Sequence, residues 1–207
     1  RNHYCCLFRF QKCISLKFLW ILVSIVINMY TPYTIPLKMQ KKYPDEIPVY
    51  IEVSQGSRNK YEYDKDLGML VLDRILHSAV FYPNDYGFIP QTLCEDGDPL
   101  DVLVLGNSPL IPGCVVIVRP ICHLVMEDEK GRDEKVVAVL VKDPKYNNIK
   151  KMSDLPPHQL LEIAQFFETY KALEKGKWVS IECWKDVNAT KKLIEDTHLN
   201  HFKLTTL

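Results

Sequence analysis

Short runs of alternating apolar and polar residues begin near Ile47 and continue through most of the chain. Residues 48–53 alternate and then meet turn-forming residues, which predicts a first strand. Residues 60–64 place two tyrosines on one side and charged residues on the other, so they predict a half-buried strand with one charged face. Further strands are predicted at residues 69–76, 102–105, 115–126, 136–141 and 177–182, and the run 115–126 is long enough for two short strands or one bent strand.

Two helices are predicted late in the chain. Residues 153–157 supply the capping side chains and prolines of a helix start, and apolar residues at three- and four-residue spacing follow up to Gly176. Tyr170 falls in this apolar stripe and Lys171 at its margin. Asn188 is predicted to cap a final short helix that ends near residue 200. Short strands joined by turns, with two late helices, predict an α+β fold built on a closed or partly closed barrel with helices on one side.

The strongest chemical signal is the segment 95–101, which reads Glu-Asp-Gly-Asp-Pro-Leu-Asp. Two ionised carboxylates about 4 Å apart repel by roughly 4 kcal/mol at an effective dielectric of about 20, so four in seven residues indicate a bound cation. The glycine and proline predict a tight bend that lets Asp96, Asp98 and Asp101 converge. Oxygen donors without Cys or His favour Mg²⁺, Mn²⁺ or Ca²⁺.

Two alternatives to a catalytic metal site apply to this loop. An EF-hand fits poorly, because the glycine stands at loop position two instead of six and Asn107 takes the place of the bidentate Glu. The other alternative is that segment 95–101 is only a solvated acidic turn. A separate acidic turn later in the chain favours a binding site instead, since Asp128 and Asp133 flank a glycine turn that can aim both side chains inward. Arg74 interrupts an apolar strand, where edge snorkelling is the simpler interpretation unless carboxylates or anions face it.

Composition limits the possible function classes. The 207 residues suffice for one domain with a sizeable core. With 26 basic and 26 acidic residues the formal charge is zero, which argues against a general nucleic-acid or membrane-surface binder. Seven cysteines include no C-x-x-C pair, so a reducing compartment such as the cytoplasm is the simplest fit. Cys94, beside the acidic loop, is interpreted as a small buried hydrophobe.

The start of the chain has a different composition. Residues 1–44 contain no Asp or Glu, and the apolar run 18–27 lies between basic residues. This run is shorter than the roughly 20 apolar residues of a spanning helix, so one interpretation is organelle or secretory targeting through residues 1–30. The other is that residues 1–38 are upstream sequence that the native protein does not carry. Either way, residues 1–38 are interpreted as a leader and 39–207 as the folded domain.

One ordered set of residues resembles the soluble inorganic pyrophosphatases of the family I type, over about residues 43–200. The segment 96–102, Asp-Gly-Asp-Pro-Leu-Asp-Val, carries the resemblance because it matches a loop and not merely a spacing. The resemblance implies an OB-like five-stranded β-barrel with flanking helices, and hydrolysis of pyrophosphate to two phosphates. It also implies several Mg²⁺ ions, for which Mn²⁺ is a possible substitute, and a homo-oligomer, either a dimer or a hexamer. The matching residues are Glu52, Lys60, Glu62, Arg74, Tyr82, Tyr86, Asp96, Asp98, Asp101, Asp128, Asp133, Lys135, Tyr170 and Lys171.

The resemblance also implies individual roles. Asp96, Asp101 and Asp133 would bind one metal ion, with Asp101 shared by a second. Asp128 and Asp133 would hold metal that arrives with the substrate, and Glu52 would lie near a further ion. The residues implied to hold phosphate oxygens are Lys60, Arg74, Tyr86, Tyr170 and Lys171, and those at supporting positions are Lys135, Glu62 and Tyr82.

Residue chemistry leads to a compatible mechanism. Pyrophosphate is a dense polyanion, so both of its ends must be neutralised before a nucleophile approaches. A water shared by two cations has a pKa far below about 15.7, and Asp98, the implied base, can take its proton near neutral pH. Arg74 would bind phosphate as a planar fork and Lys60 as a point charge.

Three rival classes share part of this pattern. A nucleic-acid module needs a basic groove with stacking aromatics, and the carboxylates would repel the backbone, so no nucleic acid is expected. A metal-dependent phosphodiesterase would use the same ions in a longer, open cleft. A structural Ca²⁺-binding domain would keep the acidic loops but need neither Arg74 nor Lys171.

Overall fold

The computed structural model describes residues 31–37 and 42–205. Contacts group the chain from Thr31 onward into one compact unit, and the boundary at residue 39 stays a prediction. The rest of the predicted leader lies outside the described residues. No helix among the described residues is long and apolar enough to cross a membrane.

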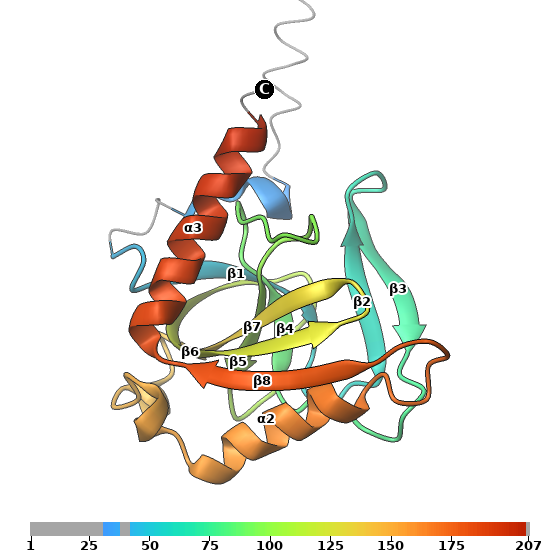
Figure 1. The fold of residues 1–207 in the computed structure, drawn as a ribbon. Helices are drawn as coiled ribbons and strands as arrows, with labels where there is room; N and C mark the ends of the chain where they lie inside the picture. The colour runs from blue at the N-terminus through green and yellow to red at the C-terminus, as the bar shows by residue number, and fades with distance from the viewer. Residues whose placement is uncertain (1–30, 38–41, 206–207) are drawn as a thin grey trace, which may run out of the picture. The chain divides into compact units, whose positions relative to one another are not determined.

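Five strands close into a ring. They pair in the order β1, β4, β5, β7 and β6, and β6 pairs back with β1, while β8 extends the sheet beyond β6. The β5–β7 pair is parallel and the other pairs are antiparallel. The strands are β1 (Ile47–Val53), β4 (Asp85–Phe88), β5 (Asp101–Leu105), β6 (Val115–Asp128), β7 (Gly131–Leu140) and β8 (Val179–Lys185) (Figure 1). The predicted α+β class, with mostly strands and two late helices, agrees with this arrangement.

The remaining two strands form a separate sheet beside the ring. β2 (Asn59–Asp64) pairs only with β3 (Met69–Ile75) among the described strands, and Lys60 stands opposite Arg74. β3 is mostly exposed despite its apolar residues. An isolated two-stranded sheet is marginally stable in water, so packing against the ring must hold this hairpin in place.

Alternating residues of the ring strands enter two different apolar clusters. In β5, Leu103 belongs to one cluster and Val104 to the other. Because both faces are apolar and covered, β1 is buried along its whole length. Ile163 of α2 packs in the first cluster and Ile194 of α3 in the second. The two helices thus cover different faces, and the prediction of helices on one side is wrong.

Helix boundaries differ from the sequence prediction. The helices are the 3-10 turns η1 (Pro32–Thr34), η3 (Pro144–Tyr146) and η4 (Met152–Asp154), and the α-helices α2 (Pro157–Thr169) and α3 (Val187–Thr205). The end of α2 comes before Gly176, because Lys171 turns away to pair with Asp128 on β6, and tertiary contacts override helix propensity. The cap of α3 is Asp186, whose Oδ1 accepts the Ala189 N–H at 2.9 Å, and not Asn188.

A buried histidine links β6 to α3 and makes stability depend on pH. His123 Nδ1 lies 2.8 Å from the Thr190 hydroxyl, which itself donates to the Asp186 carbonyl, so the histidine is the donor. Burial, helped by Lys185 and Arg132, lowers the pKa of His123 to about 4. In the unfolded chain the pKa is about 6.5, so the unfolded state binds more protons and stability falls as the pH drops from about 6.5 toward 4.

We expect H123N, which keeps an N–H donor but does not titrate, to lose this pH-dependent fall. His123 should contribute about 2 kcal/mol to this fall between pH 7 and pH 4.5 in the wild type. Urea unfolding at pH 7 and pH 4.5 measures it, and H158N, at an exposed helix position, is the control. An equal loss of stability in H123N and wild type would contradict the assignment.

Candidate active site

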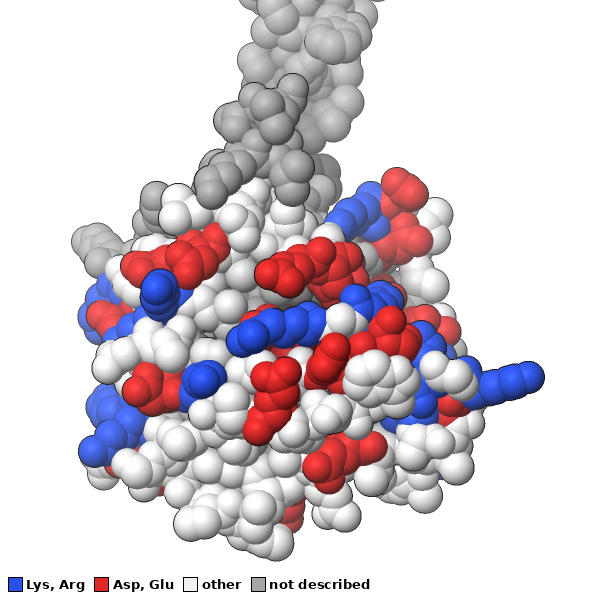
Figure 2. Space-filling view, viewed as in Figure 1, with Lys and Arg blue, Asp and Glu red and all other residues white. Residues whose placement is uncertain are grey.

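A cavity of about 550 Å³ lies between the β2–β3 hairpin and the ring. Its polar lining brings together parts of the chain that are far apart in sequence: the hairpin, the acidic loop before β5, the β6–β7 turn and the turn after α2. Every residue that the resemblance singles out lines it: Glu52, Lys60, Glu62, Arg74, Tyr82, Tyr86, Asp96, Asp98, Asp101, Asp128, Asp133, Lys135, Tyr170 and Lys171. Figure 2 shows acidic and basic side chains interleaved on this face.

The acidic loop has the tight bend that its sequence predicts. Gly97 has a φ of +87°, in the left-handed region that favours glycine. The Asp98 N–H donates to Asp96 Oδ1 at 3.1 Å, and the Cys94 N–H donates to the Asp98 carbonyl at 2.8 Å. Local backbone bonds therefore hold the loop, and the Asp98 side chain remains exposed toward the cavity.

Lys135 joins the two acidic segments. Its Nζ lies 2.5 Å from Asp101 Oδ2 and 2.7 Å from Asp133 Oδ2. Burial lowers the pKa of Lys135, but Asp101 and Asp133 outweigh it and hold the pKa well above its usual range. Burial also raises the pKa of Asp133 to about 6, against the effect of Lys135 and with a contribution from Asp101. The two carboxylates thus converge on one cation.

A second cluster lies at the tip of the β6–β7 hairpin. Lys171 Nζ lies 2.6 Å from Asp128 Oδ2 and 3.6 Å from Glu129 Oε1, and Lys177 Nζ lies 2.5 Å from the same Glu129 oxygen. The other oxygen, Glu129 Oε2, is buried without a hydrogen-bond partner among the described residues. Sequence reasoning missed Glu129 and Lys177 as cavity residues. The position of Glu129 beside Asp128 was the available signal.

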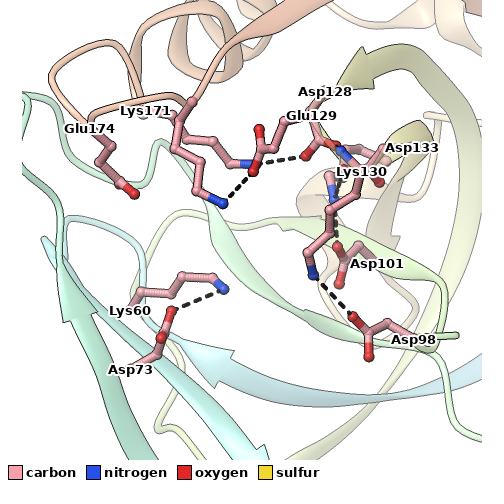
Figure 3. A network of polar contacts seen from close by, with 12 residues as sticks. Lys60, Asp73, Asp98, Asp101, Asp128, Glu129, Lys130, Asp133, Lys171 and Glu174 are labelled. Carbon is pink, nitrogen blue, oxygen red and sulfur yellow. Dashed lines mark hydrogen bonds and ion pairs between the residues drawn. The ribbon is translucent and has the colours of Figure 1, made fainter. Parts of the chain in front are cut away.

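The hairpin supplies the opposite wall. Arg74 lies 2.7 Å from Asp73 through Nη1 and 3.1 Å from Glu174 through Nε, so carboxylates face it and edge snorkelling does not describe it. Lys60 contacts Glu62 and lies 3.3 Å from Asp73. In Figure 3 its ammonium points across the cavity toward the side that carries Asp98 and Asp101. Asp73 and Glu174 carry no separate signal in the sequence.

Glu52 lies at the back of the cavity and is 7% exposed. Its Oε1 accepts the Tyr63 N–H at 2.8 Å. Burial raises the pKa of Glu52 to about 8, and Asp101 adds to the shift. Burial, and then Asp96, raise the pKa of Asp98 as well. Burial is the main cause of both pKa shifts, and the neighbouring carboxylates add to it.

The lining fits hard cations in ligand type. Eleven carboxylates stand against seven Lys and Arg side chains, and the lining contains no His or Cys. This excess of negative charge would repel a phosphate compound unless cations offset it, and oxygen donors suit Mg²⁺ or Mn²⁺. In the part of the chain that the structure describes, no three His, Cys, Asp or Glu side chains form a ready metal cage. Lysine ammonium groups contact several of the carboxylates instead, so metal binding requires those carboxylates to turn away from lysine.

Removing the shared ammonium group should destabilise the metal-free protein. We expect Lys135→Met to lower the free energy of unfolding by about 3 kcal/mol, because Asp101 and Asp133 would be left close together without a cation. The matched control is Lys130→Met. Lys130 is 3.8 Å from Asp98 and both side chains are 61% exposed, so its loss should change stability by less than about 1 kcal/mol. Urea unfolding in EDTA measures both, and equal stability of Lys135→Met and wild type would contradict this account.

Comparison with known proteins identifies the family of the chain that forms this cavity. The family model described as inorganic pyrophosphatase matches residues 49–201. The chain belongs to the inorganic pyrophosphatase family. The family prediction from the loop and its companion residues is therefore confirmed.

Individual relatives agree with this assignment. The inorganic pyrophosphatase of Thermus thermophilus is 55% identical over 155 residues, which cover 74% of this chain and 89% of that protein. The inorganic pyrophosphatase of Haloferax volcanii is 53% identical over 152 residues, covering 73% and 86%. The crystal structure of the Thermus thermophilus inorganic pyrophosphatase superposes with a TM-score of 0.80 at 49% sequence identity, covering 83% of this chain and 99% of that one.

Proposed function

We propose that this inorganic pyrophosphatase family member hydrolyses pyrophosphate to two orthophosphates in a Mg²⁺-dependent reaction. The observation that carries the proposal is a single cavity lined by carboxylates from the acidic loop and the β6–β7 turn and by Lys60 and Arg74 of the β2–β3 hairpin. We further propose that the closed five-stranded ring is an OB-like barrel.

The carboxylate side would hold the metal ions. Asp96, Asp101 and Asp133 would share one ion, with Asp101 also serving a second, while Asp128 and Glu52 would serve ions beside them. Bound Mg²⁺ supplies charge neutralisation of phosphate oxygens and a water of lowered pKa. Mn²⁺ has the same preference for oxygen donors and is the expected substitute.

The protein's own side chains do the remaining work. Asp98 takes the proton from the attacking water, since it is exposed to the cavity and carries no strong ion pair. The groups that hold the phosphate oxygens in line for the attack are Lys60, Arg74, Tyr86, Tyr170 and Lys171. Burial raises the pKa of both tyrosines, so their hydroxyls stay protonated and donate. Donors fixed in advance stabilise the charge that develops in the transition state.

Supporting residues keep these groups in place. Lys135 offsets the charge of Asp101 and Asp133, and Glu62 contacts Lys60. The Tyr82 ring lies 5.3 Å from the Tyr86 ring, which limits the positions open to the Tyr86 hydroxyl.

A substrate panel tests the proposal. With Mg²⁺ present, we expect phosphate release from pyrophosphate to exceed phosphate release from nucleotides and p-nitrophenol release from bis-p-nitrophenyl phosphate by at least about 100-fold, because the charged lining of the cavity suits a small polyanion. Preference for the diester would favour a phosphodiesterase. Metal binding without turnover of any of these compounds would favour a structural cation-binding domain.

Assembly and location stay predictions. A homo-oligomer, dimer or hexamer, follows from the family resemblance, and light scattering of the purified protein measures it. A cytoplasmic location, with targeting through residues 1–30 as the alternative, is tested by sequencing the amino terminus of the protein from its own cell.

A further inference from the structure

The segment Thr31–Leu37 precedes the region 49–201 that the family model matches, yet it reaches the catalytic cavity. Two hydrogen bonds join the backbone of this segment to Gln91, which follows β4. The Gln91 N–H donates to the Tyr33 carbonyl at 3.1 Å, and Gln91 Oε1 accepts the Leu37 N–H at 3.3 Å. Leu37 is fully buried in the core cluster that contains Val104. The hydrogen bonds to Gln91 and the burial of Leu37 therefore both hold the segment against the ring.

Tyr33 is the residue of this segment that lines the cavity. It contacts both the ring and the β2–β3 hairpin. Its ring stacks on Phe88 of β4, with centroids 4.8 Å apart and an interplanar angle of 17°. Its hydroxyl donates to the Tyr63 carbonyl on β2 at 3.2 Å, and the two tyrosine rings lie 5.5 Å apart. Lys65, on the β2–β3 turn, holds its Nζ 4.5 Å from the centre of the Tyr33 ring.

These contacts matter because the hairpin lacks a strand neighbour in the ring among the described strands. Tyr63 attaches it through both backbone groups: its N–H donates to Glu52 on β1, and its carbonyl accepts from Tyr33. The same hairpin carries Lys60 and Arg74, which stand opposite each other across the two strands. Any shift of the hairpin would move both cations relative to the carboxylate wall.

We propose that Tyr33 is a positioning residue of the active site, which fixes the hairpin so that Lys60 and Arg74 stand at the right distance from the acidic loop. This inference rests on the proposed function. Tyr33 does not need to touch the substrate; it acts through Tyr63 and the strand that Tyr63 belongs to. A small displacement of such phosphate-binding groups is enough to reduce kcat/KM substantially.

Steady-state kinetics with Mg²⁺ and pyrophosphate tests the proposal. We expect Tyr33→Ala to lower kcat/KM at least tenfold, mainly through a higher KM, because misplaced Lys60 and Arg74 weaken binding of both substrate and transition state. Tyr33→Phe keeps the stacking on Phe88 and loses only the hydroxyl, so a change of about threefold is expected. If Tyr33→Ala does not fold, Tyr33→Leu replaces it with the same expectation.

Hydrogen exchange gives a readout that does not depend on activity. Amides of residues 59–75 should exchange faster in Tyr33→Ala than in the wild type, while those of β5–β7 should not change. The matched control is Tyr43→Ala. Tyr43 also precedes the matched region and packs against the core, but it is not part of the cavity lining. It should lower Tm and leave KM and hairpin exchange unchanged.

The outcomes separate this inference from the function on which it rests. A Tyr33→Ala protein with lower Tm but wild-type KM and wild-type hairpin exchange would overturn it, since Tyr33 would then only add stability. A wild-type protein that does not hydrolyse pyrophosphate would refute the proposed function instead. In that case hairpin exchange alone decides whether Tyr33 positions Lys60 and Arg74.

Discussion

Asp98→Asn should reduce kcat for pyrophosphate by roughly 10²- to 10⁴-fold, the usual contribution of a general base. Asparagine has nearly the same shape, and the side chain of Asp98 has one ion-pair partner among the described residues, Lys130 at 3.8 Å. The Asp98 backbone bonds to Asp96 and Cys94 do not involve its side chain. The variant should therefore fold normally, bind Mg²⁺ and substrate, and fail at proton removal.

Three measurements make this result specific. Stopped-flow phosphate release gives kcat, calorimetric Mg²⁺ titration confirms that metal binding persists, and thermal unfolding should show a stability change within about 0.5 kcal/mol. Asp66→Asn is the matched control, since it removes one exposed carboxylate from the rim of the same cavity without removing the base, and it should stay within threefold of wild type. Turnover of Asp98→Asn within that same range would reject Asp98 as the base and leave the proposed reaction standing.

The acidic loop was predictable because local sequence determines it. Gly97 and the flanking aspartates specify a bend through backbone preferences and short-range hydrogen bonds, so seven residues contain nearly all the information. The glycine turn at Gly131 likewise brings Asp128 and Asp133 onto one hairpin. Family resemblance then supplied companions that spacing alone could not place together, such as Arg74 and Lys171.

What the sequence did not reveal depends on long-range packing. The end of α2 was predicted at Gly176 because apolar residues continue at helical spacing, but Leu173 is 69% exposed and the chain turns after Thr169. Glu174 faces Arg74 only because that turn exists. Tyr33 was set aside with the leader, since composition distinguishes a basic, acid-free segment from a folded one but does not show where its last residues pack. The contacts that decide these positions, such as Lys171 with Asp128 and Arg74 with Glu174, join residues far apart in the sequence.

The metal ions give the largest expected effect of all. Treatment with EDTA should lower turnover of pyrophosphate at least about 1,000-fold, because the cavity lining has eleven carboxylates against seven cations and cannot accept a polyanion unaided. Adding Mg²⁺ in excess should restore the rate, and Mn²⁺ should restore it in part. Retention of full activity in EDTA would contradict the proposed mechanism.

Stability gives a second, independent measure of the same ions. A ligand that binds only the folded protein stabilises it by about 2.7 kcal/mol at 100 times its Kd, so Mg²⁺ should raise Tm. Asp133→Asn should reduce that gain, whereas Glu95→Gln should not, since Glu95 belongs to the acidic loop but does not line the cavity. Lys135→Met should show a larger gain than wild type, because Asp101 and Asp133 are then free of their shared ammonium group. If Mg²⁺ shifts Tm equally in all four proteins, the ions bind elsewhere and these carboxylates are not their ligands.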